Sequence, residues 1–177
     1  LRELALDRTL QEQPAFETNI LLWASRAPAN DWEYQRVVSA IDGQIDRNLA
    51  WITEDRMYGV RGMTFFPVAL GEEELAGEDN SRAYFVHLPR LPEHATVMDG
   101  GRLPAEPEAD TAEGPLSLEV LIPLKAANRF GLAVGDTVVA VPPQTARASS
   151  VTVKIVGILE SNDPTDPFWQ LDLSLRP

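Results

Sequence analysis

Apolar residues between positions 30 and 52 recur at the spacing of an α-helix. Every fourth position on one face is apolar, namely Val37, Ile41, Ile45 and Leu49. Charged residues fall on the opposite face, which is typical of a helix that packs on one side only. Asn30 and Glu33 have the three-residue spacing of a capping box, so we expect the helix to begin there. Gly43 in its interior costs about 1 kcal/mol relative to alanine.

Other patterns flank this helix. Residues 1–12 are helix-like, and Pro14 ends that pattern. Residues 18–25 read TNILLWAS, and their continuous apolar run predicts a strand buried on both faces. After the helix, residues 57–68 are rich in aromatic and β-branched residues and predict a long strand that bends at Gly59 or Gly62.

The second half of the chain shows short strands separated by polar loops. Residues 71–115 contain 11 acidic and 3 basic residues, and most of this region predicts solvated loops. The strands that we expect are residues 83–88, 118–122, 137–141 and 151–159. In the last of these, alternate residues should face the core and the solvent.

Residues 123–141 predict a short helix, a tight corner and a strand. PLKAANR at 123–129 suits one or two helical turns, and Gly131 can close them in the left-handed conformation. Gly135 and Asp136 form a turn signal that opens the strand at 137–141. Together these patterns predict an α+β fold with two lobes. An N-terminal strand-helix-strand lobe comprises residues 1–75, joined by 161–177, and a small β-rich lobe comprising residues 80–160 is inserted into it.

The composition excludes some classes of function. The 177 residues carry a net charge of −12, so nucleic acid and anionic membrane surfaces would repel most faces of the protein. The chain has no cysteine, which excludes disulfides and thiolate chemistry. It begins at Leu1 without a methionine, and we expect it to be a monomeric piece of a longer protein.

Candidate reactive residues are few. His87 and His94 are the two histidines, and their spacing does not define metal-ligand geometry or a Ser-His-Asp triad. His87 is more simply the solvent-facing residue of its strand. Asp163 and Asp166 in DPTDP allow three interpretations: calcium ligands, an acid pair for glycoside chemistry, or turn-forming residues before proline. The turn interpretation is the stronger one, because the spacing lacks the rhythm of a calcium loop.

Two further groups of residues invite interpretation. Glu72, Glu73 and Glu74 predict a solvated loop, with contact to a cation or a basic partner as the alternative. The four tryptophans predict packing in the core or at its rim, and Trp169, beside Phe168, is the one that we expect at an interface. We therefore expect no catalytic, cofactor-binding or metal-binding residues.

Three phrases of the sequence carry a likeness to a known family. They are Gly-Arg-Leu-Pro at 101–104, Ala-x-x-x-Gly-Leu-x-x-Gly-Asp at 127–136, and a strand with Val-Gly-Ile at 156–158. In this order and spacing they resemble the extracytoplasmic region of FtsX-like ABC transporter permeases, the MacB-like periplasmic core domain. The helix leading into FETNILLWAS and the next helix also resemble the segment after the first membrane span of such permeases.

The resemblance implies a non-catalytic domain between two transmembrane helices, on the extracytoplasmic side of the cell membrane in an integral membrane protein. It implies that a cytoplasmic ATPase subunit or domain hydrolyses ATP while the outer domain handles a substrate or partner. The corner at Gly135 and Asp136 would then be scaffold. Two features depart from the family: the chain stops 17 residues after Glu160, and the acidic inserts at 72–79 and 105–114 are not family hallmarks.

Two alternatives belong to other classes. Gly-Asp corners also occur in double-psi barrels, so a soluble barrel enzyme is one of them. Its site would bring Asp136, Asp163, Asp166 and His87 around one pocket. A solute-capturing domain is the other, and calorimetric titration with candidate solutes would separate it from a purely mechanical domain.

Overall fold

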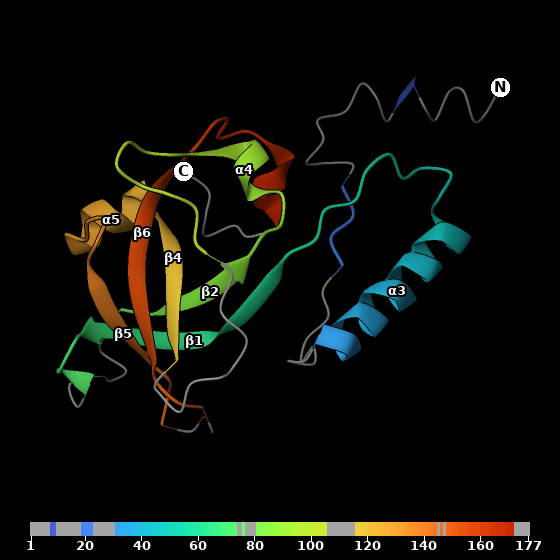
Figure 1. The fold of residues 1–177 in the computed structure, drawn as a ribbon. Coiled ribbons are helices and arrows are strands. Elements are labelled where there is room, and N and C mark those ends of the chain that lie inside the picture. The colour runs from blue at the N-terminus through green and yellow to red at the C-terminus, as the bar shows by residue number, and fades with distance from the viewer. Residues whose placement is uncertain are drawn as a thin grey trace. The chain divides into compact units, whose positions relative to one another are not determined.

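The fold was analysed in a computed structural model, which describes residues 8–9, 19–22, 31–73, 76, 81–105, 116–144, 146 and 148–171 (Figure 1). The chain divides into two compact units, Leu1–Met57 and Tyr58–Pro177. The fold class is α+β, as the sequence predicts. The helix-like pattern at 1–12 lies outside the described residues except for Arg8 and Thr9, which are helical.

Helix α3 (Asp31–Asn48) is the main element of the first unit (Figure 1). It confirms the helix predicted from the four-residue spacing. Val37, Ile41, Ile45 and Leu49 are half-buried, and no described residue of this unit is fully buried. On another side of the helix, the guanidinium of Arg56 contacts Asp42 at 3.3 Å and also pairs with Asp46. These ion pairs hold the segment after the helix against α3.

The strand predicted at 18–25 is wrong over its described part, residues 19–22. These residues form no strand, and Ile20, Leu21 and Leu22 are 60%, 47% and 56% exposed. An apolar run indicates a buried strand only where other strands flank it. No strand pairs with residues 19–22 among the described residues, so the apolar run there has no sheet in which to be buried.

The second unit is built on a mixed sheet of six strands within the part of the chain that the structure describes. The path of neighbouring strands is β2-β1-β5-β6-β3, and β4 also pairs with β6. The strands are β1 (Val60–Ala69), β2 (Ala83–His87), β3 (Ala95–Val97), β4 (Ser117–Pro123), β5 (Thr137–Val141) and β6 (Val151–Ser161). Only the β4–β6 pair is parallel. The path is open, because β2 and β3 pair with each other nowhere in the described ranges.

Strand β1 belongs to this sheet, whereas the sequence pattern indicated that it belongs to the N-terminal lobe. Its first half pairs with β2 and its second half with β5. The pairing with β2 shifts register between Arg61 and Thr64, around Gly62, which is one of the two positions at which the sequence predicts a bend. Pro67 lies opposite Ala140 of β5, in the half of β1 that has no partner on its β2 side. A proline is tolerated there because it leaves no sheet hydrogen bond unmade.

Strand β6 is the centre of the unit (Figure 1). It pairs with β5 along 151–154, with β4 along 152–159 and with β3 along 159–161. The predicted alternation holds from Val151 to Ile155, where odd positions are buried. The register with β4 then skips Val156, because Val120 is opposite Ile155 and Leu121 is opposite Gly157. This bulge buries Val156 and Gly157 in succession.

The predicted helix, corner and strand are confirmed. Helix α5 (Leu124–Phe130) follows Pro123, and Gly131 ends it at φ 64° and ψ 32°, in the left-handed region. Gly135 has φ 100° and donates its N–H to the carbonyl of Ile155 at 2.8 Å. The amide of Ile155 donates in return to the carbonyl of Asp136 at 2.9 Å. The corner therefore extends the pairing of β5 with β6.

Two short helical elements were not predicted: α4 (Leu91–His94) and the 3₁₀ helix η2 (Pro167–Gln170). Each carries a proline in its first turn. Phe65, Ala140, Val151 and Val153 form a cluster of buried side chains in the described part of the second unit. Ile155, Phe168 and Trp169 are the largest fully buried side chains, each 1% exposed.

Candidate functional site

One pair of titratable side chains is brought together from distant parts of the sequence. His94 is the last residue of α4, and Asp166 is the residue that caps η2. The imidazole Nδ1 lies 2.6 Å from the Asp166 carboxylate oxygen Oδ2 across a separation of 72 residues. The side chains are 14% and 25% exposed, so both are largely shielded from water.

The surroundings fix the orientation of both groups. The other carboxylate oxygen of Asp166 accepts the backbone N–H of Phe168 at 2.8 Å, which caps the first turn of η2. The Phe168 ring stacks on the His94 ring with centroids 3.9 Å apart and planes 5° from parallel. Because an ionised carboxylate only accepts hydrogen bonds, we assign the proton of the pair to Nδ1 of His94.

The far side of the imidazole is closed. Nε2 of His94 is buried and has no hydrogen-bond partner among the described residues, and the same holds for Oγ of Ser161. In a Ser-His-Asp triad an aspartate orients a histidine in this way, but Nε2 must then reach a nucleophile and a substrate. A buried and unpartnered Nε2 offers neither. Among the described residues, the pair therefore supplies only the orienting half of a triad.

Asn162 makes a second set of bonds beside this pair. Its N–H donates to the carbonyl of His94 at 3.0 Å, and its side-chain amide donates to the carbonyl of Glu93 at 3.4 Å. The hydroxyl of Thr96 donates to its Oδ1 at 2.6 Å. Asn162 and Asp166 thus attach the segment after β6 to α4 and β3.

Asp163 is a turn residue, as the stronger interpretation of DPTDP predicts. Its Oδ1 accepts the N–H of Thr165 at 2.8 Å and the hydroxyl of Thr165 at 2.7 Å. These bonds stabilise the ionised form and hold the pKa of the Asp163 carboxyl below its usual value. Its backbone carbonyl accepts the indole N–H of Trp169 at 3.0 Å.

In the described part of the chain, no hydrogen bond joins the side chains of the four residues of the hypothetical barrel site to one another. Asp166 binds His94 and not His87. His87 is exposed at the end of β2, opposite Val60, which confirms that it faces solvent. Asp136 accepts the N–H of Ala133 at 2.8 Å within the corner. Among the described residues no three His, Asp or Glu side chains are grouped to hold a metal ion.

A partly exposed ion pair lies at the Gly-Arg-Leu-Pro phrase. The guanidinium of Arg102 contacts one carboxylate oxygen of Glu119 on β4, and the N–H of Ala105 donates to the other at 2.9 Å. The hydrogen bond from Arg102, with that from Ala105, lowers the pKa of Glu119 to about 2. This pair was not predicted, because nothing in the spacing of 17 residues indicates that the loop returns to the strand.

The three phrases that carry the family likeness meet at β6. A Cβ added to Gly101 would lie 2.8 Å from the Cα of Gly157, and one added to Gly157 would lie 2.7 Å from the Cδ2 of Leu121. The N–H of Arg102 donates to the carbonyl of Val156 at 2.9 Å. Gly135 reaches the neighbouring Ile155. Close backbone approach therefore explains Gly101 and Gly157, whereas positive φ explains Gly131 and Gly135.

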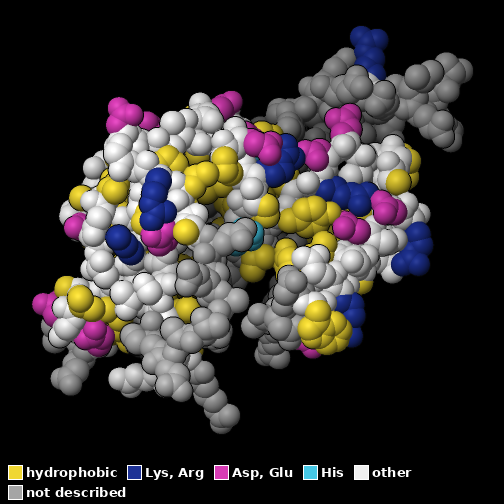
Figure 2. Space-filling model, in the orientation of Figure 1, with side chains coloured by type: hydrophobic (Ala, Val, Ile, Leu, Met, Phe, Trp, Pro, Cys, Tyr) yellow, Lys and Arg dark blue, Asp and Glu magenta, His cyan; other side chains and the backbone are white. Residues whose placement is uncertain are grey.

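The tryptophans depart from expectation. Trp169 was expected at an interface, but it is 1% exposed. Its indole N–H is hydrogen-bonded, and its ring packs edge-to-face with that of Phe168, with the ring centroids 5.1 Å apart. Trp32 and Trp51 were expected at the core or its rim, yet they are 62% and 68% exposed. Figure 2 shows hydrophobic side chains at the surface in several places beside acidic and basic ones.

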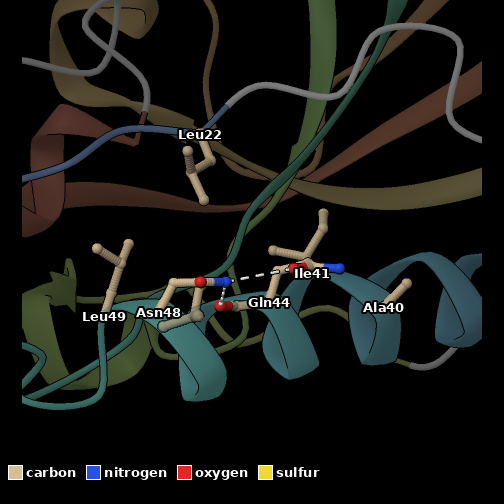
Figure 3. A pocket seen from close by; sticks show the side chains of 7 residues that line it. Leu22, Ala40, Ile41, Gln44, Asn48 and Leu49 are labelled. Carbon is tan, nitrogen blue, oxygen red and sulfur yellow. Dashed lines mark hydrogen bonds between the residues drawn. The ribbon is translucent and has the colours of Figure 1, made fainter.

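A shallow apolar groove runs along α3 in the first unit (Figure 3). Leu22 faces the helix across the groove, and Ile41, Ile45 and Leu49 line the helical side together with Ala40, Gln44 and Asn48. Asn48 donates its side-chain amide to the carbonyl of Gln44 at 2.8 Å. The side-chain amide of Asn48 also donates to Oε1 of Gln44 at 3.3 Å, so the groove has an apolar lining with two amide side chains that bond to each other within the helix.

No helix in the described ranges combines the length and the apolar character needed to cross a bilayer. Comparisons with protein-family models, with curated proteins and with solved structures give no match to this chain.

Proposed function

We propose that this chain is a non-catalytic domain of an ABC transporter permease, located on the extracytoplasmic side of the cell membrane. In this role it couples motion of the transmembrane helices to the handling of a substrate or partner outside the membrane. ATP hydrolysis belongs to a cytoplasmic ATPase subunit or domain of the same transporter.

The observation that carries the proposal is the meeting of the three phrases on β6. Residues 101–104, 127–136 and 156–158 are separated in sequence, but Gly101 touches Gly157 and Gly135 bonds to Ile155. The ordered phrases are therefore one packed structural unit, as expected if they define a domain and did not arise independently. Each acts through backbone geometry, which agrees with a mechanical role.

The absence of cysteine provides a direct test of location, because a single introduced cysteine is a unique label in this region. Glu72→Cys places a thiol on an exposed position, and Val139→Cys places one at a position that is 4% exposed. We expect a membrane-impermeant maleimide to label Glu72→Cys in intact cells that produce the full-length protein, and to label Val139→Cys only after denaturation. We also expect the protein in the membrane fraction.

Three outcomes would contradict the proposal. Labelling of Glu72→Cys only after cell lysis would place the domain inside the cell. Recovery of the full-length protein in the soluble fraction would exclude a permease. Heat released on titration of this chain with a small solute would favour the solute-capturing alternative.

A further inference from the structure

The segment after β6 packs back onto the second unit. Asn162 and Asp166 bond to α4 and β3, and Phe168 and Trp169 are each 1% exposed. We call residues 162–171 the clasp. The clasp is held by hydrogen bonds near its start and by two buried aromatic rings near its end. Loops between secondary-structure elements usually lie on the surface, so burial of this kind is unusual for a connecting segment.

The clasp ends where the unit begins. A Cβ added to Gly59, just before β1, would lie 3.9 Å from the Cβ of Leu171 and 2.8 Å from the Cδ2 of Leu88. Leu88 follows β2 and is 8% exposed. Gly59, at the start of the second unit, and Leu171, at the end of the clasp, are therefore neighbours in space, although they are more than 100 residues apart in sequence.

His94 connects the clasp to the rest of the unit. Its ring stacks on the ring of Phe168, and its Nδ1 is hydrogen-bonded to the Asp166 carboxylate, which caps η2. Its backbone carbonyl accepts the N–H of Asn162. His94 thus contacts the start of the clasp through its backbone and the middle of the clasp through its side chain, whereas β5 and β6 are held together by their own pairing.

From these contacts we infer that the clasp is a cooperative unit that fastens the C-terminal end of the second unit to its N-terminal end, with His94 as the positioning residue. When the clasp opens, Leu171 moves away from Gly59, so the start of β1 and the end of the clasp separate while β5 and β6 stay paired. Such partial opening below the free energy of global unfolding is a general property of proteins. The inference concerns the fold alone and does not depend on the proposed function.

Amide hydrogen exchange of the 177-residue chain tests this inference. We expect the amides of the clasp and those at the start of β1 to share one protection level, below that of the β5–β6 pair. His94→Ala removes the ring under Phe168 and leaves Asp166 without its partner. It should speed exchange in the clasp and at the start of β1 together, roughly 10- to 100-fold. Val139 and Val153 should be unaffected.

His87→Ala is the matched control, since it removes the other histidine from an exposed position on β2. It should leave exchange in the clasp unchanged. Asp166→Asn is a milder variant that keeps an acceptor for the N–H of Phe168 and alters only the bond to His94, so it serves if His94→Ala does not fold. It should act in the same direction, with a smaller factor.

Two results would overturn the inference. If His94→Ala or Asp166→Asn accelerates exchange equally throughout the unit, the clasp is not a separate cooperative element. If only the amides next to Phe168 respond while the start of β1 keeps its protection, the two chain ends are not coupled.

Discussion

Replacement of Gly157 by alanine tests the close contact on which β6 depends. The added methyl would lie 2.7 Å from Cδ2 of Leu121, 2.9 Å from Cγ1 of Val97 and 3.0 Å from the carbonyl oxygen of Arg102. The two side chains can turn away, but the carbonyl belongs to the backbone that is bonded to Val156. To relieve the close contact with this carbonyl, either the loop that contains Arg102 or the bulge at Val156 therefore has to shift.

The expected loss of stability results from two opposing effects. Overpacking of a well-packed site costs about 1–3 kcal/mol, whereas alanine gains about 0.4–1 kcal/mol by restricting the unfolded chain. We expect Gly157→Ala to lower the free energy of unfolding by about 1–2 kcal/mol, which for a chain of 177 residues is a decrease in melting temperature of about 2–8 °C. Urea unfolding followed by far-UV circular dichroism measures this change.

Gly62→Ala is the control, because the nearest atom to its added methyl is the carbonyl oxygen of Phe85 at an ordinary 3.5 Å. It should be neutral or slightly stabilising. The double variant Val97→Ala/Gly157→Ala should lose less stability than the sum of the two single variants. Removal of Cγ1 of Val97 leaves room for the methyl group added at position 157. If Gly157→Ala proves as stable as Gly62→Ala, the close approach of the loop to β6 is refuted.

Three more predictions concern the second unit. Gly131→Ala forces a left-handed backbone on alanine and should cost about 1–2 kcal/mol in urea unfolding; an unchanged midpoint would contradict the helix cap. Phe168→Ala should cost about 3–5 kcal/mol in the same assay, and a loss below about 1 kcal/mol would mean that η2 is not packed as described. The pKa of Glu119 is lowered by folding to about 2 from 4.5, so its ionised form stabilises the fold above pH 4.5 and this contribution is lost as the pH falls toward 2. Glu119→Gln should therefore be less stable than the wild type at neutral pH and similar to it near pH 2, and a difference that is independent of pH would refute the ion pair.

Local patterns predicted the elements whose residues determine their own conformation. The four-residue spacing indicated α3, and Pro123 and Gly131 marked the two ends of α5. The strand at 137–141 has the predicted bounds, since turn residues precede it and β-branched residues fill it. Alternation along β6 was correct up to Ile155.

Tertiary contacts were the part that local patterns could not supply. The hydrophobic run from Ile20 to Leu22 predicted a buried strand, but it could not show that no described strand would flank these residues. The pairing of His94 with Asp166 joins residues 72 positions apart, and no periodicity reports such a contact. Asp166 before Pro167 did contain a usable signal, because a capping residue before a proline is typical of a helix start. The interpretations considered for Asp166 were a turn, a calcium ligand and an acid pair, and none of them was a helix cap.

The central position of β6 has a consequence for synthesis of the protein. Among the described strands, β3 and β4 pair with β6 alone, and β6 comprises residues 151–161, late in this chain. A nascent chain can form the β1–β2 and β1–β5 pairs early. Strands β3 and β4, however, have no partner strand until Val151 and the residues after it leave the ribosome. Chains that stall before that point expose these edges to aggregation and to chaperones.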